Sequence, residues 1–120
     1  MITNFEDITY PLTDQEKKLV KIMINGLKKR IGIGPVKAYE IIEIINDKYP
    51  DIKFSGPRLR KLTNLIRSLS ILPLIATSKG YYVSYDQDTI KSQIKSLEER
   101  ADAILNSAKG LKKFIKDEEG

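Results

Sequence analysis

The sequence contains no cysteine and no histidine, and these two absences remove the usual parts of most enzyme sites. Without cysteine the chain has no disulfide, no thiol nucleophile and no zinc–thiolate site. Without histidine it lacks both the commonest metal ligand and the commonest general base at neutral pH. We therefore expect that the protein is not an enzyme, with no catalytic residues, no metal and no cofactor.

Long hydrophobic runs are also missing. The longest apolar stretch, Ile71 to Ala76, is far shorter than the roughly 20 residues that span a bilayer. The first residues, Met1 to Asp7, are acidic and lack the apolar core of a signal peptide. The 120 residues are 41% hydrophobic and 31% charged, as in a soluble domain with a small appendage. We expect a cytoplasmic protein without membrane contact.

Acidic residues are absent from the middle of the chain. Residues 52–85 carry six Lys or Arg side chains and no Asp or Glu, whereas residues 86–120 are nearly neutral. An acid-free segment of this kind attracts a polyanion, and nucleic acid is the usual polyanion for such a patch. The charge pattern predicts duplex DNA as a partner.

Helical periodicity, caps and turn residues predict an N-terminal arm, then three helices and a hairpin. The expected elements are an arm over 1–12, helices over 13–29, 36–48 and 55–69, a short strand over 52–54, and hairpin strands over 72–77 and 80–84. Thr13 and Glu16 have the capping-box spacing, and Pro35 suits the first turn of the second helix, which we expect to be largely buried. This is the element order of a winged helix-turn-helix, placed at 13–85 and mainly α with a small β-hairpin.

Residues 55–69 are typical of a recognition helix with Ser55 as its N-cap. One side is apolar, formed by Leu59, Leu62, Leu65, Ile66 and Leu69. The opposite side predicts base readout by Arg60, Asn64 and Arg67, since Arg pairs with guanine and Asn with adenine. Phosphate contacts are predicted for Arg58, Lys61, Thr63 and Ser68, and for Thr77, Ser78 and Lys79 at the hairpin tip.

The segment 86–120 is predicted to form an oligomerisation helix and tail, capped by Asp86 or Asp88. Its apolar residues alternate in spacings of four and three, as in a coiled coil. They are Ile90, Ile94, Leu97, Ala101, Ile104, Ala108, Leu111 and Ile115, which we call the heptad seam. The pattern predicts a homodimer or higher oligomer without giving the helix orientation. Two alternatives stay open: a C-cap at Gly110, and a helix that folds back on its own domain.

Three stretches carry a resemblance to a known family: Ser55 to Arg67, Ile75 to Val83, and Ser96 to Ala101. Over roughly residues 34–111 the chain resembles small winged-helix proteins encoded by bacteriophages and prophages, which have a C-terminal coiled-coil helix. The resemblance implies DNA binding without a defined role. The role that we expect for an oligomeric DNA-binding protein of a mobile element is transcription regulation or replication-origin recognition.

A second function class stays open from the sequence. A winged helix also serves as a scaffold for protein contacts, so a phage-encoded modulator that docks on a host protein is the alternative. Tyr81, Tyr82 and Tyr85 lie near the basic segment, but no carboxylate cluster accompanies them to hold the metal that DNA cleavage by a tyrosine would use.

Overall fold

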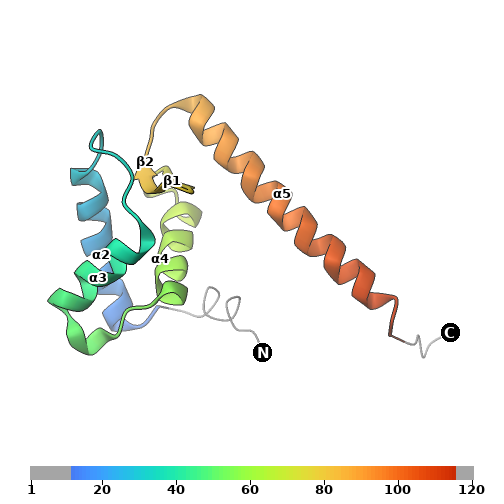
Figure 1. Cartoon of the computed structure of the whole chain (residues 1–120), viewed down its shortest axis with the longest axis horizontal. Helices are drawn as coiled ribbons and strands as arrows, with labels where there is room; N and C mark the ends of the chain where they lie inside the picture. The colour runs from blue at the N-terminus through green and yellow to red at the C-terminus, as the bar shows by residue number, and fades with distance from the viewer. Residues whose placement is uncertain (1–11, 116–120) are drawn as a thin grey trace. The chain divides into compact units, whose positions relative to one another are not determined.

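The computed structural model describes residues 12–115 (Figure 1). Its helices and its hairpin divide between two units, and the boundary lies between Tyr85 and Asp86. The predicted arm over 1–12 lies outside the described residues except for Leu12. The elements, labelled as in Figure 1, are α2 (Asp14–Lys29), α3 (Ala38–Lys48), the 3₁₀ turn η1 (Pro50–Ile52), α4 (Gly56–Ser68), β1 (Leu74–Thr77), β2 (Gly80–Val83) and α5 (Gln87–Lys112).

Helix α2 begins where the capping box predicts. The Glu16 N–H donates to Thr13 Oγ1 over 3.2 Å, and the Thr13 N–H donates to Glu16 Oε1 over 3.0 Å. These two bonds satisfy backbone donors that have no partner inside the helix. The buried side of α2 is formed by Leu19, Val20, Met23 and Leu27, at the predicted helical spacing.

Helix α3 differs from the prediction at its start and in its burial. Pro35 precedes the helix, because Val36 is extended and exchanges two backbone hydrogen bonds with Tyr81, of 2.9 and 2.8 Å. Only Ile45 is fully buried, so the prediction of a largely buried helix is wrong. A short helix at the edge of a small domain buries one stripe against its neighbours, which leaves Tyr39 and Ile44 65% and 55% exposed.

The connection from α3 to α4 is held by Asn46. Its side-chain amide donates to the Phe54 carbonyl over 3.0 Å, and its Oδ1 accepts from the Phe54 N–H over 2.7 Å. The predicted strand over 52–54 is therefore wrong: η1 occupies part of it, and Lys53 follows with a left-handed φ of 55°. Ser55 is the N-cap of α4 as predicted, but its side chain makes no capping hydrogen bond.

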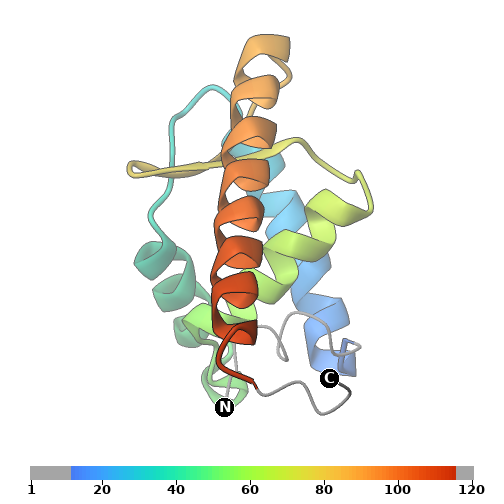
Figure 2. The ribbon, with the colours of Figure 1, turned by 90° about the vertical axis from the view of Figure 1, so that its right-hand side faces the viewer.

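The hairpin is antiparallel, with Leu74 opposite Val83 and Thr77 opposite Gly80. Figure 2 shows the hairpin crossing the segment that joins α2 to α3, where Val36 adds a one-residue bridge beside β2. Gly80 is required there: its φ is +128°, and a Cβ would lie 2.5 Å from the Val36 carbonyl oxygen. The bridge ties the hairpin to a segment about 45 residues earlier.

The core of the first unit lies between α2, α4 and the hairpin. Leu19 on α2 and Leu59, Leu62 and Ile66 on α4 are the most completely buried side chains. Leu72, Leu74 and Val83 close the core from the hairpin side. Leu69 was predicted to share the apolar side of α4, but it is 62% exposed because α4 ends at Ser68 and the chain turns.

Helix α5 is one continuous helix with Asp86 as its N-cap, whose carboxylate accepts from the Thr89 N–H over 2.9 Å. It passes through Gly110 without a break, so the C-cap alternative at Gly110 is wrong. Ile115, the last residue of the heptad seam, lies just beyond the helix. None of the helix residues is buried. Within residues 12–115, no helix combines the length and apolar character that a bilayer span needs.

Candidate nucleic-acid interface

Helix α4 exposes a polar row that runs along one side of the helix. Arg60, Asn64 and Ser68 are exposed and follow one another at intervals of four residues, so they lie in one line. The Arg60 guanidinium lies over the first turn, 3.5 Å from the place where a Cβ of Gly56 would stand. The opposite side of α4 is held in the core by Leu59, Leu62 and Ile66. The core therefore fixes the rotation of α4 and with it the direction of the polar row.

Two of the predicted phosphate contacts are instead part of a buried ion-pair cluster. Lys61 Nζ lies 2.8 Å from Glu16 Oε1, and Arg58 Nε lies 3.3 Å from Glu16 Oε2. Lys61 and Glu16 are 7% and 3% exposed. Arg58 also donates through Nη1 to the Ile52 carbonyl over 2.6 Å. These cations tie α4 to α2 and η1, and the burial of Lys61 keeps its ammonium away from the surface.

Glu16 is ionised in this cluster. Burial by itself raises the pKa of Glu16, but hydrogen bonds from Lys61, from the Thr13 N–H and from Arg58, together with the charge of Lys61, outweigh it. The pKa of Glu16 therefore lies below its ordinary value, and the carboxylate is charged at neutral pH.

Two further predicted contacts also have structural roles. Thr63 is buried and its hydroxyl donates to the Arg60 carbonyl over 3.0 Å within α4. Arg67 is partly buried and its Nε donates to the Leu74 carbonyl over 2.9 Å, which ties α4 to β1. Of the seven residues predicted on this helix, Arg60, Asn64 and Ser68 are thus the ones that are exposed.

The hairpin tip exposes Thr77, Ser78 and Lys79 together, as the predicted phosphate contacts require. The Lys79 N–H donates to Thr77 Oγ1 over 3.1 Å, which orders the turn. Lys37, at the start of α3, donates through Nζ to the Ser78 carbonyl over 3.2 Å. The tip therefore carries one cation of its own and a second one from another part of the chain.

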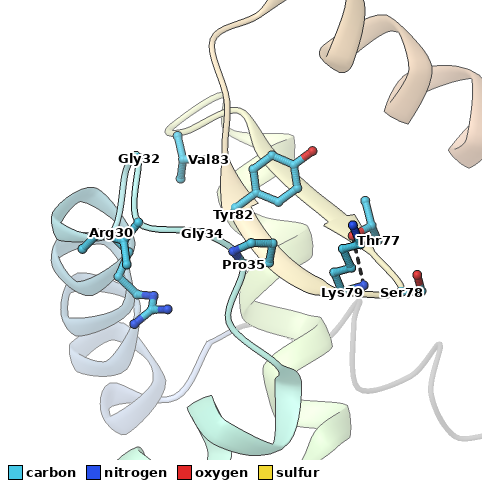
Figure 3. Close-up of a pocket in the computed structure, with 10 residues that line it drawn as sticks. Arg30, Gly32, Gly34, Pro35, Thr77, Ser78, Lys79, Tyr82 and Val83 are labelled. Carbon is cyan, nitrogen blue, oxygen red and sulfur yellow. Dashed lines mark hydrogen bonds between the residues drawn. The ribbon is translucent and has the colours of Figure 1, made fainter.

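An open hollow of about 590 Å³ lies between the hairpin and the α2–α3 connection. Figure 3 shows Thr77, Ser78 and Lys79 on one side of it, Arg30 and Gly32 on the other, and Pro35 and Tyr82 between them. All of these lining residues belong to the first unit. The hollow joins the basic hairpin tip to a second basic position at the end of α2.

Sequence reasoning missed Lys37 as a neighbour of the hairpin tip and Arg30 as a residue that lines the same hollow. Both residues flank the Gly32–Gly34 turn, for which the sequence pattern indicates only a connection between two helices. Their position depends on the pairing of Val36 with Tyr81, and a single bridging residue leaves no alternating pattern that would reveal it. Glu16 was recognised as a capping residue, but its pairing with Lys61 joins residues 45 positions apart.

The tyrosines near the basic segment have different surroundings. Tyr81 packs against the core, Tyr82 lines the hollow, and Tyr85 is 63% exposed. Within the described residues, no three His, Cys, Asp or Glu side chains are grouped as a metal site would need.

Comparisons with known proteins identify no relative: the chain matches no protein-family model, no curated protein and no solved structure. Functional inference therefore depends on the geometry of α4, the hairpin and α5 alone.

Proposed function

We propose that this protein is a winged-helix DNA-binding protein that self-associates through α5. The observation that supports it best is the exposed row Arg60, Asn64 and Ser68 on a helix whose other side is fixed in the core. Helix α2, the Val36 bridge, α3, α4 and the hairpin follow one another in the order of a winged helix. In this proposal α4 enters the major groove and the hairpin is the wing.

Base readout is assigned to Arg60 and Asn64. An arginine donates two parallel hydrogen bonds to guanine O6 and N7, and an asparagine pairs in the same bidentate way with adenine N6 and N7. The two residues lie about 6 Å apart along the helix axis, one turn of an α-helix. Arg67 was predicted for the same role, but its bond to Leu74 directs its Nε inward, so we assign it to positioning α4.

Phosphate contacts are assigned to the exposed polar groups around the wing. Ser68 on α4 and Thr77, Ser78 and Lys79 on the hairpin remain from the predicted set, and Lys37 joins them through its bond to Ser78. We exclude Lys61, Arg58 and Thr63 from the proposed interface, because their polar groups form hydrogen bonds inside the protein. None of the side chains assigned to the surface is acidic, and the carboxylate of Glu40 accepts from the Lys37 N–H over 3.1 Å beside it.

The biological role proposed with this activity is transcription regulation or replication-origin recognition by a phage or prophage protein. Self-association through the heptad seam would place two α4 helices on one duplex. Two linked DNA-binding units recognise two half-sites, which raises both the affinity and the specificity for DNA over those of a single unit.

Salt dependence of DNA binding tests the proposal directly. Fluorescence anisotropy of a random duplex is measured between about 50 and 300 mM salt, where counterion release gives a linear fall of log K with log salt. We expect a slope of several units. Absence of binding at the lowest salt would refute the DNA proposal.

Two variants and one control then assign roles. Asn64→Ala is expected to reduce the preference for the selected site by about 1–3 kcal/mol while nonspecific binding changes little. Lys79→Ala is expected to weaken binding to all sequences and to reduce the salt slope by about one unit. Lys95→Ala removes an exposed charge from α5 and is the matched control, which should leave the affinity unchanged.

One observation favours the alternative, a protein-docking module. A groove of about 430 Å³ between α2 and α3 is lined by Ile22, Ile41, Ile44 and Tyr49, and Ile44 is 55% exposed. Exposed apolar grooves of this kind often accept a partner protein. If DNA binding fails, Ile44→Asp is the variant with which to test loss of a host partner in a pull-down.

A further inference from the structure

Helix α5 carries an apolar seam whose side chains are exposed. The seam residues Ile94, Ile104 and Leu111 are 48%, 52% and 68% exposed. Leu105, at the flank of the seam, is 58% exposed. The helix is 26 residues long, about 39 Å. A strict heptad repeat over this length is typical of a helix that pairs with another helix of the same kind.

We propose that the seam pairs with the seam of a second copy in antiparallel orientation, with Ala101 opposite the partner's Ile104. In this register Ala108 lies opposite the partner's Leu97, and Ile94 lies opposite the partner's Leu111. The inference deepens the self-association in the proposed function and does not depend on DNA binding. It identifies the partner as a second copy of this chain and states its direction and alignment.

The two alanines provide the first argument for the direction. A parallel in-register pair would place Ala101 against Ala101 and Ala108 against Ala108, between layers of paired leucine and isoleucine. The large layers hold helix axes about 8–10 Å apart, so each alanine layer would leave a void. The antiparallel pair instead combines every alanine with a leucine or isoleucine. The four central layers then have nearly equal volume, which lets the helices pack closely without voids.

We chose the register in which the largest number of apolar seam residues face an apolar residue of the partner. In the proposed register every seam residue from Ile94 to Leu111 faces another seam residue, and Ile115, just past the helix, lies opposite the partner's Ile90. A shift by one heptad would place the polar Gln87 opposite the partner's Leu111. The proposed register therefore buries every seam residue from Ile94 to Leu111, which that shift does not.

The helix dipoles and the lysines of the last turn give a second argument. The first turn of α5 carries Asp88, and its last turn carries Lys109 and Lys112, with Lys113 as the C-cap. Parallel pairing would bring Lys109 and Lys112 of both copies to one end. Antiparallel pairing separates these C-terminal lysines and opposes the two helix dipoles, which outweighs the approach of Lys91 to the partner's Lys112.

Spin-label distances measured by pulsed electron paramagnetic resonance test direction and register together. The chain lacks cysteine, so Ser92→Cys and Asn106→Cys, made separately in the full-length protein, each give one label per copy. Ser92 and Asn106 occupy the same heptad position on the side away from the seam. Their labels therefore project outward in the same way, and each is the control for the other.

The two labels must give different distances if the proposal is right. Along the helix axis, the two Ser92 labels would be about 21 residues or about 32 Å apart, and the two Asn106 labels about 7 residues or about 10 Å. A parallel pair would give the same short distance for both labels. The antiparallel register shifted by one heptad toward the N-terminus would give equal distances near 21 Å. Equal distances, or no dipolar signal, would overturn the inference.

A substitution in the seam confirms which surface produces the signal. Ile104→Asp places a charge opposite the partner's Ala101, so it is expected to abolish the dipolar signal. Ser96→Asp places the same charge outside the seam and is expected to leave both distances unchanged. Because these measurements contain no DNA, a failure here is distinguishable from a failure of the salt titration: a monomer that still binds DNA would overturn only the pairing.

Discussion

Replacement of the buried Glu16 by alanine is expected to destabilise the first unit more than removal of any exposed charge. Glu16 and Lys61 side chains are 4% and 8% exposed, so the substitution leaves a buried ammonium without its carboxylate. Breaking a buried pair in this way costs about 3–5 kcal/mol. The loss of the capping box adds about 1 kcal/mol. Since a small domain is stable by only about 5–15 kcal/mol, this is a large fraction of the total.

Urea denaturation followed by circular dichroism measures the effect. With a slope of about 1–3 kcal/mol per molar urea, the expected loss lowers the midpoint by about 2 M. Glu16→Gln is the informative intermediate, because a glutamine oxygen still accepts from the Thr13 N–H and from Lys61. Its amide NH₂ would face the Arg58 donor, so this variant should lose part of the stability.

A double-mutant cycle isolates the ion pair. Lys61→Met removes the buried ammonium, so Glu16→Gln should cost less in that background, with a coupling energy of about 0.5–3 kcal/mol. If the two substitutions are additive, or if Glu16→Ala costs less than about 1 kcal/mol, the buried pair does not stabilise the fold as we argue.

The same cluster makes stability depend on pH in the acid range. The pKa of Glu16 is lowered in the folded state, so the folded protein binds its proton less readily than the unfolded chain. The stabilisation is fully present above the unfolded pKa of a glutamate and is lost as the pH falls through the lower folded value. Glu16→Gln should flatten this part of the profile, and an unchanged acid profile in the variant would contradict the assignment.

Two further predictions concern contacts that hold the hairpin and α4. Gly80→Ala should destabilise by about 1–3 kcal/mol, because φ is +128° and the new Cβ would meet the Val36 carbonyl; an unchanged urea midpoint would disprove the close approach. Asn46→Ala should cost about 1–3 kcal/mol by leaving the Phe54 N–H and carbonyl without their partner. Asn46→Asp keeps the acceptor and should recover part of the loss in the same assay.

Several features were predictable because they are local in the sequence. The capping box of Thr13 and Glu16 lies within one turn, so its spacing predicted the start of α2 correctly. The apolar stripe of α4 and the two hairpin strands were predicted by their periods, apart from shifts at the ends. The heptad seam predicted a long last helix, and α5 extends through Gly110 as one helix.

Other features depend on contacts between distant parts of the chain. Lys61 lies at the margin of the apolar stripe of α4. At that position the helical period does not decide whether the side chain is buried or exposed. Its burial depends on Glu16, which is 45 residues away. The bridge between Val36 and Tyr81 and the exposure of Ile44 likewise depend on which elements pack together.

Sequence by itself determined the helices, the hairpin and the heptad seam, because period and capping act over a few residues. Only tertiary structure decided which basic side chains remain on the surface, because each cation's place depends on the partner that folding brings to it.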